Sequence, residues 1–534
     1  MTWTGSAEPV TDEIGGAVTG HTVGAGTTLS AGYIIGAADG AGFTLTNNGV
    51  VGSTTVSTGV LVVPAGDSVF NSGKIISSTV VGTGVSLEQG GYVQNASGAT
   101  ISGEQALLAT SAFAEVVNTG SIISSGGVFG VRLNDGGLLI NNSNGYVHGR
   151  YDGAFIGGAS GDVHNPGTFS GGTAGVFLRG GGEVFNYTNG IISANYAVAI
   201  GGGSGLVTNT GLINGGNLGV EESDGGSVVN SAGATINGAL GVHIFGGAGN
   251  VRNLGTINAG ASGTAVALAA GFNNALAIYP GSTIVGTVSG GNTIGSTATS
   301  VLQLGTDSSV GTLTGIGTKY LNFTSIYEVP LASWVVGASI PTGMTLTDDG
   351  TLDNLGNVHT TATLGSGAVL TNSGGAIITG ATYGVYDNAG PGTVVNNGQI
   401  TATNLFSYGV GLGKGGALTN QAQGFVSARE GAYFGGASAA TVVNAGQILG
   451  NIAGNGDGFR LHGGGTVTNL GGTVSGIYGI QIGSGAGTIT NAGTISGGAL
   501  GKAVKFANNF AVTGPELEAA RALVAAFVAD RRAA

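Results

Sequence analysis

Apolar and polar residues alternate along most of this chain in short runs that glycines separate. Between Gly241 and Ile257 the apolar positions recur with a period of two, which is the period of a β-strand and not of a helix. Glycine pairs such as Gly225-Gly226 and Gly464-Gly465 follow the short runs, and glycine adopts the positive φ angles of tight corners at no steric cost. The pattern predicts short strands joined by sharp turns.

A motif of the form apolar-x-Asn-x-Gly-x-apolar, seen in Val251–Ile257, returns about every 23 residues, and a period of this size indicates a solenoid. Its asparagines occupy positions 47, 71, 95, 118, 141, 165, 186, 209, 230 and 253, and then 354, 372, 396, 420, 444, 469 and 491. Three strands and three corners per period predict one coil of a right-handed parallel β-helix.

Stacked coils lie about 4.8 Å apart, so equivalent asparagine amides are close enough to bond to one another in a ladder. We interpret the recurrent asparagine as such a ladder or as a turn former, a structural role that requires no ligand. The ladder is expected to include Asn71, Asn118, Asn165, Asn209, Asn253, Asn396, Asn444 and Asn491.

Interruptions of the motif divide the chain into five expected segments. They are N-terminal capping rungs over residues 1–40, a first β-helix arm over 41–271, a β-rich junction over 272–345, a second arm over 346–506 and a C-terminal segment over 507–534. In the last segment Pro515 suits the first turn of a helix, and Leu517, Ala520, Val524 and Phe527 share one face. We expect a short amphipathic α-helix that covers the last rung, carries an export signal or docks a partner.

Composition narrows the function classes. The 534 residues include 112 glycines and no cysteine, which removes disulfides and thiolate chemistry. Charged residues make up 7% of the chain and the net charge is −12, with Lys and Arg scattered singly, so a nucleic-acid partner is not expected. No run of apolar residues is long enough for a transmembrane helix, and Met1–Val10 has no signal-peptide pattern, so export is expected to use no evident cleaved N-terminal signal.

The same fold supports polysaccharide lyases and hydrolases, whose chemistry needs clustered carboxylates. Glu221, Glu222 and Asp224 form the densest acidic cluster in the rungs and are the candidate catalytic residues. Aligning the rungs puts Glu222 and Asp387 in an otherwise apolar, inward-facing column, where a lone carboxylate is unfavourable. We therefore expect the strand to end early or to bulge there, so that these residues point outward, or else to find each carboxylate paired.

Calcium is the one cofactor that the sequence leaves open. Asn455 and Asp457 lie in an Asn-Gly-Asp-Gly stretch that is similar to part of a calcium loop, although the full ligand spacing is missing. The six histidines stand singly in different rungs without the spacing of a metal site.

The rungs Val228–Ile236, Val251–Ile257 and Thr488–Ile495 resemble the repeats of β-helical passenger regions in bacterial autotransporter and filamentous-haemagglutinin-type adhesins. The stretch from Gly311 through Trp334 to Leu352 is similar to a longer segment that recurs in that group. The resemblance covers most of residues 20–506 and implies a β-helix with an adhesive role. The membrane β-barrel of autotransporters and the signal peptide of two-partner adhesins are not evident in this chain.

From these observations we expect an exported structural or adhesive protein of the bacterial surface, without enzyme activity. It would associate with itself into filaments or a biofilm matrix, and its partners would include glycans or proteins of host or cell surfaces. A surface-layer lattice protein and a polysaccharide lyase or hydrolase are the alternatives. The adhesive ligand, the export route and the symmetry of any assembly stay open.

Overall fold

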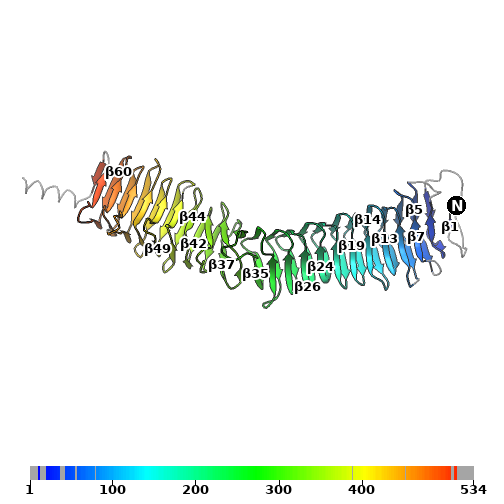
Figure 1. The fold of residues 1–534 in the computed structure, drawn as a ribbon. Coiled ribbons are helices and arrows are strands. Elements are labelled where there is room, and N and C mark those ends of the chain that lie inside the picture. The colour runs from blue at the N-terminus through cyan, green and yellow to red at the C-terminus, as the bar shows by residue number, and fades with distance from the viewer. Residues whose placement is uncertain are drawn as a thin grey trace, which may run out of the picture. The chain divides into compact units, whose positions relative to one another are not determined.

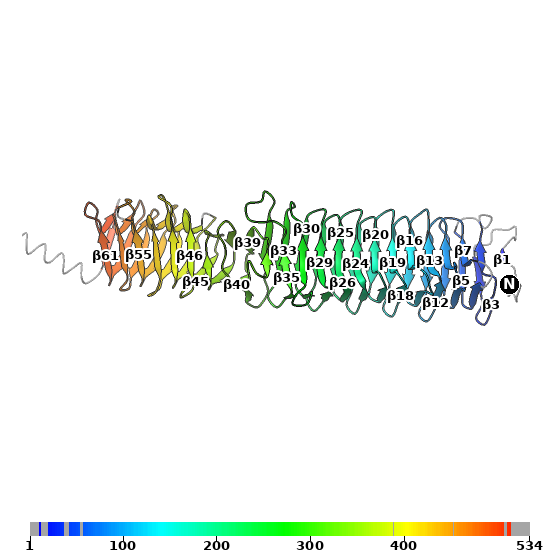
Figure 2. The same ribbon diagram turned by 60° about the horizontal axis from the view of Figure 1, so that its bottom comes forward.

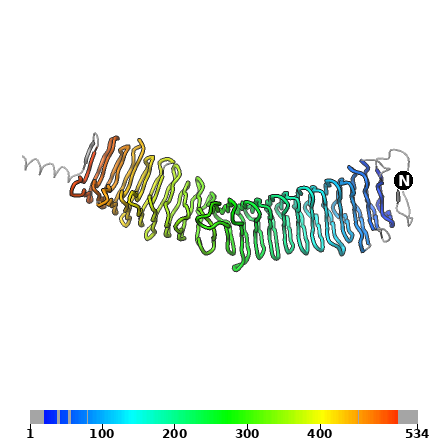
Figure 3. Tube along the Cα trace, viewed as in Figure 1, coloured from blue at the N-terminus to red at the C-terminus, as the bar shows by residue number. Residues whose placement is uncertain are grey.

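The computed structural model describes residues 10–11, 20–36, 42–53, 57–78, 80–387, 389–451, 453–506 and 510–513. These residues wind into a parallel β-solenoid of about 21 turns, drawn as stacked coils in Figures 1 and 3. The described part of the chain contains strands, turns and bends but no helix. The prediction of an all-β solenoid is confirmed, whereas the helix expected from Pro515 lies outside the described residues.

The chain divides into two compact units. The first comprises residues 1–277 and 281–292, and the second comprises 278–280 and 293–534. The five segments expected from the sequence, including two arms and a junction over 272–345, stay predictions.

Most coils of the first unit have three short strands, and in two coils one longer strand, β24 (Ile191–Ile200) or β26 (Leu212–Glu222), takes the place of two of them. In one three-stranded coil these are β27 (Gly226–Asn230), β28 (Thr235–Asn237) and β29 (Leu240–Ile244). They pair in parallel with β30 (Gly249–Asn253), β31 (Thr256–Asn258) and β32 (Thr264–Leu268) of the next coil. The successive strands form the parallel rows seen in Figure 2.

The strands that end in the recurrent asparagine form one continuous sheet within the first unit. They are β5 (Thr44–Asn47), β8 (Ser68–Asn71), β11 (Gly91–Asn95), β14 (Ala114–Asn118), β17 (Gly137–Asn141), β20 (Gly161–Asn165), β23 (Gly182–Asn186), β25 (Gly205–Asn209), β27 and β30.

Part of the expected capping segment belongs to the solenoid itself. Strand β2 (Gly20–Val23) pairs with β5, and β4 (Tyr33–Ile35) pairs with β7 (Thr58–Val62). Tyr33 and Ile35 are buried in the same way as core residues of later coils. Residues 20–36 therefore form a coil.

The second unit repeats this arrangement with three separate rows of strands. Its asparagine-ended strands are β42 (Thr351–Asn354), β45 (Val369–Asn372), β48 (Gly392–Asn396), β51 (Gly416–Asn420), β54 (Ala440–Asn444), β57 (Gly465–Asn469) and β60 (Gly487–Asn491). In a second row β36 (Ser300–Leu304), β39 (Ser325–Glu328), β41 (Thr345–Asp348), β44 (Ala362–Leu364) and β47 (Tyr383–Asp387) pair in sequence.

Valine, isoleucine and leucine fill the interior because alternate residues of each strand point into the coil. Val228, Val242, Val251 and Ile257, for example, have no exposed surface. Fully buried side chains of this kind each stabilise the fold by about 1.5–3 kcal/mol, so the stacked apolar columns supply most of the driving force.

The asparagine ladder is present in both units. Each Nδ2 donates to Oδ1 of the next asparagine at 2.7–2.9 Å, from Asn47 through to Asn253 and from Asn354 through to Asn491. Nδ2 of Asn230 also donates to the carbonyl of Thr256 in the next coil, at 3.0 Å. Only a side chain with both a donor and an acceptor can continue such a row, which explains why asparagine recurs.

In many coils the glycine of the motif is required by close approach of the backbone. A Cβ atom at Gly120 would collide with the carbonyl oxygens of Ala96 and Ala99 in the preceding coil. The turn after Asn118 therefore stacks directly on the turn of the preceding coil, with no room for a side chain. At Gly98 and Gly233 a Cβ atom would meet open space, and there glycine is favoured by its positive φ angles of 78° and 79°.

Candidate functional site

The first candidate cluster contains Glu222, which ends strand β26 (Leu212–Glu222) and lies in the core. The strand stays in register to its last residue, because Glu222 pairs with Ile200 and Ile244 of the neighbouring coils. Its side chain has no exposed surface. The expectation of a shortened or bulged strand that turns Glu222 outward is therefore wrong.

Two glycines make room for the Glu222 carboxyl group. A Cβ atom at Gly205 would lie 2.8 Å from Oε1, and one at Gly226 would collide with Oε2. Neither oxygen has a hydrogen-bond partner among the described residues. Burial raises the pKa of Glu222 to about 8, so the group is largely protonated at neutral pH.

Glu221 and Asp224 lie apart from the Glu222 carboxyl group. Glu221 points to the outer face of β26, where it pairs with Ala199 and His243. Asp224 lies in the following turn and accepts hydrogen bonds from the Gly202 amide at 2.7 Å and from Ser223 Oγ at 3.0 Å. Glu222 faces inward, Glu221 faces outward and Asp224 caps a turn, so the three carboxyl groups of the predicted cluster do not share a site.

Asp387 is buried in the corresponding row of the second unit. Its Oδ1 accepts hydrogen bonds from the amides of Ala389 at 2.8 Å and Gly390 at 3.3 Å. Burial raises the pKa of Asp387, and these turn amides act in the opposite direction. The outward orientation expected for Asp387 is wrong, and the turn that follows the strand supplies hydrogen-bond donors instead.

The structure also contains a buried carboxyl pair that the sequence did not reveal. Glu328 and Asp348 are register partners in adjacent coils, and neither side chain is exposed. The Gly350 amide donates to Asp348 Oδ1 at 2.9 Å. Burial raises the pKa of both groups, and the neighbouring Asp348 charge raises that of Glu328 further. The pair is therefore expected to hold a proton at neutral pH.

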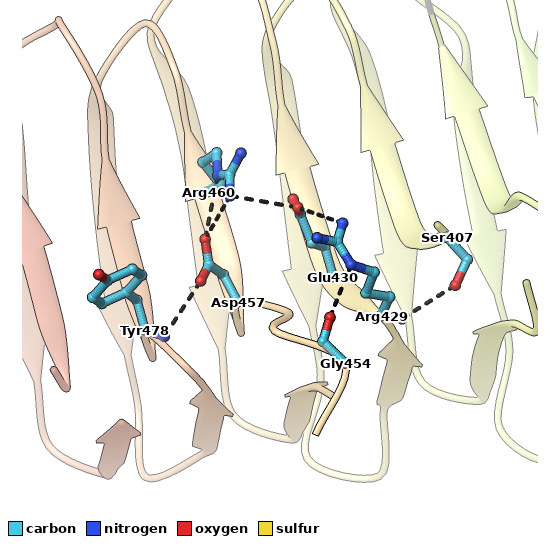
Figure 4. Close-up of polar contacts among 7 residues, drawn as sticks. All are labelled: Ser407, Arg429, Glu430, Gly454, Asp457, Arg460 and Tyr478. Atoms are coloured by element: carbon cyan, nitrogen blue, oxygen red, sulfur yellow. Dashed lines mark hydrogen bonds and ion pairs between the residues drawn. The ribbon is translucent and has the colours of Figure 1, made fainter. Parts of the chain in front are cut away.

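A charged cluster of the second unit, drawn in Figure 4, contains Arg429, Glu430, Asp457 and Arg460. Glu430 and Asp457 are each 2% exposed. Arg460 bridges them, because Nη2 lies 3.0 Å from Asp457 Oδ2 and 3.5 Å from Glu430 Oε1. Arg429 Nη1 lies 3.3 Å from the same Glu430 oxygen.

This network balances two buried carboxylates with two partly exposed guanidinium groups. Burial raises the pKa of Glu430, and the positive charges of Arg460 and Arg429 oppose that shift. Sequence reasoning missed the network because Glu430 and Asp457 lie in adjacent coils that are separated by a long corner, which breaks the regular spacing of the repeat. The signal that could have revealed it is the register of the two coils, which aligns Glu430 at the start of β53 (Glu430–Phe434) with Asp457 two residues before β56 (Phe459–Leu461).

Both calcium candidates lie in the corner before β56 (Phe459–Leu461), where protein donors engage the Asp457 carboxylate. Asp457 Oδ2 accepts hydrogen bonds from Arg460 Nε and Nη2, and Oδ1 accepts one from the Tyr478 amide at 3.3 Å. Asn455 adopts a φ of 56° in the preceding turn. Within the described ranges no group of three or more His, Asp or Glu side chains is placed to hold a metal ion.

Aromatic side chains form a second surface feature beside this network. The rings of Tyr383 and Tyr408 stack at 5.2 Å, and the rings of Tyr408 and Tyr433 lie 5.4 Å apart. Tyr386 contacts Tyr383 at 4.5 Å. The rings pack against one another along successive coils, so one side of the second unit has an aromatic row that continues into the charged network.

Among the residues that the structure describes, no helix has the length and apolar character that a membrane crossing requires. Comparison of the chain with protein-family models, with curated proteins and with solved structures finds no match.

Proposed function

We propose that this protein is a structural and adhesive β-solenoid of the bacterial cell surface that acts through repetition. The observation that supports the proposal is the in-register stacking of coils, which repeats equivalent outward side chains at each strand spacing. Many weak contacts along such a row add up to firm attachment when they act together.

The composition of the outer faces supports self-association as part of this function. Few charges are available to repel a second molecule, and the strands offer hydroxyl and amide groups such as Thr235, Asn237 and Asn250. The same features suit filaments, a biofilm matrix or a surface-layer lattice, and they suit attachment to glycans or proteins of another cell.

An enzyme of the polysaccharide-degrading class is the less favoured alternative. Its proposed central residue, Glu222, has no exposed surface, and a polymer bound to the outside of the solenoid does not reach it. General acid–base catalysis requires the carboxyl group to lie within hydrogen-bond reach of the substrate.

Negative-stain electron microscopy of the purified protein at neutral pH, with and without calcium, tests the proposal. We expect ordered polymers or lateral bundles, and a calcium requirement would favour the surface-layer form. Isolated molecules that also fail to attach to bacterial or host cell surfaces would contradict it.

A further inference from the structure

A groove of about 850 Å³ lies on the second unit where three successive coils differ in the length of one corner. The corner between β49 (Gln399–Ala402) and β50 (Tyr408–Leu412) has residues 403–407, and the corner between β55 (Gln447–Gly450) and β56 (Phe459–Leu461) has residues 451–458. Between them, the corner joining β52 (Phe425–Ala428) to β53 (Glu430–Phe434) is Arg429 alone. Two long corners therefore flank a short one.

The floor of the groove is a row of outward side chains from four coils. Thr401 pairs with Ser427, Ser427 with Leu449 and Leu449 with Ser475. Three strand spacings make this row about 14 Å long, which is the length of a short oligosaccharide. Thr403, Asn404 and Asn451 add hydroxyl and amide groups from the two long corners.

Arg429 is the one charged residue among the described residues that line the groove. Its side chain is held from both sides: Nε donates to the Gly454 carbonyl at 3.1 Å, and its Cζ lies 5.3 Å from the centre of the Phe406 ring. Its backbone amide donates to Ser407 Oγ at 3.1 Å. Figure 4 shows the guanidinium group between the Gly454 corner and Glu430.

The hydrogen-bonding capacity of Arg429 exceeds its observed use. Nε donates to Gly454 and Nη1 donates to Glu430 Oε1, whereas Nη2 makes no hydrogen bond within the described part of the chain. A guanidinium group has five N–H donors, and it recognises carboxylate and sulfate-like anions through paired bonds. Because Arg429 is already fixed, a ligand would bind it with little loss of side-chain entropy.

We propose that this groove binds an acidic saccharide, with Arg429 contacting a carboxylate or sulfate group and the Thr, Ser and Asn side chains contacting sugar hydroxyls. The inference rests on the proposed adhesive function and assigns it a ligand class and a site. Hydroxyl and amide side chains around one fixed cation match a ligand that has many hydroxyls and one anionic group per sugar.

Isothermal titration calorimetry of the full chain tests the site with an oligogalacturonate, a heparin-derived tetrasaccharide and neutral cellotetraose. We expect one of the two acidic probes to bind, with cellotetraose at least tenfold weaker. The Arg429→Gln variant should lose about tenfold or more in affinity, because charge-assisted hydrogen bonds are among the strongest single contacts. Arg132→Gln is the matched control, since Arg132 also lies over aromatic rings but in the first unit.

A second variant leaves the ion pair of Arg429 intact. Ser427→Phe places a bulky side chain on the floor of the groove and should abolish binding without disturbing Glu430. Three results would overturn the inference. They are failure of both acidic probes to bind, undiminished binding of the acidic probe by either variant, and binding of inorganic sulfate as tight as that of the saccharide. If the saccharide does not bind but the protein still polymerises or attaches to cells, only the binding site is disproved and the proposed function stands. If the protein neither polymerises nor attaches to cells, the proposed function itself is disproved.

Discussion

At Glu222 the chain places a carboxyl group where the adjacent coils have Ile200 and Ile244. The folded protein binds a proton there up to about pH 8, while an unfolded chain releases it near pH 4.5. Between these values the folded state holds more protons than the unfolded state, so its stability falls as the pH rises. In that window the free energy of unfolding falls by about 1.4 kcal/mol per pH unit, and above it the fall stops.

Replacing Glu222 by glutamine should therefore stabilise the protein at pH 9 by several kcal/mol and change little at pH 4, since the amide stays neutral. Urea denaturation at the two pH values, followed by circular dichroism, measures the effect. Glu221→Gln is the control, because that side chain is on the outer face of the same strand. Equal shifts for both variants would contradict the assignment.

A ladder asparagine differs from Glu222, because each polar atom of its side chain takes part in a hydrogen bond. Replacing Asn230 by alanine removes bonds from Asn209 and to Asn253 and leaves buried amide groups unpaired. We expect a loss of about 2–4 kcal/mol in unfolding free energy, given about 1–3 kcal/mol for each buried polar group left without a partner. Asn250→Ala, at an exposed position of strand β30, should change the denaturation midpoint little.

At the scale of elements, the ion network links strand β53, which begins at Glu430, to strand β56, which contains Arg460. Replacing Arg460 by leucine would leave Glu430 and Asp457 without their shared partner. We expect the free energy of unfolding to fall by about 3 kcal/mol at pH 8. This value is at the lower end of the range for breaking a buried ion pair, because the Arg460 guanidinium group is partly exposed. At pH 4 protonation of Glu430, whose pKa burial raises, should remove part of this loss, and thermal unfolding at the two pH values would show whether it does.

The strands themselves were predictable because one coil repeats the chemistry of the next. Alternating valine and isoleucine, the corner glycines and Asn253 with its equivalents together specify strand length, turn position and register. Glu222 was misjudged because the sequence rule that a carboxyl group avoids the core ignores protonation and the space that Gly205 and Gly226 leave. The Glu328–Asp348 pair was missed because its strands lie where the asparagine motif is interrupted.

The groove at Arg429 depends on corner lengths that differ between coils, and such irregularities carry no periodic signal. That Arg429 lies between two long corners can be recognised only when the first and last residues of the strands are known. Local irregularity, rather than the repeat, therefore determines where the proposed binding site lies.

On the scale of the molecule, whole coils are interchangeable units. Deleting residues 231–253 would join Asn230 directly to Leu254, and the neighbouring strands would meet in the register they already use. We expect this variant to keep its β-sheet circular dichroism and a thermal midpoint close to that of the parent, since a solenoid is stabilised by contacts between neighbouring coils.

Deleting residues 242–253, about half a coil, is the matched control. It would place outward residues in the core and break the asparagine row, so we expect aggregation or loss of cooperative unfolding. Similar behaviour of the two deletions would argue against coils as independent structural units.

The register also sets the order in which the protein can acquire its structure. Asn47 bonds to Asn71 and Asn71 to Asn95, so every pairing joins residues that are about one coil apart in sequence. A newly emerged segment can therefore dock on the coil before it without waiting for distant parts of the chain. Folding can therefore advance from one end as the polypeptide leaves a ribosome, with each docked coil serving as the template for the next.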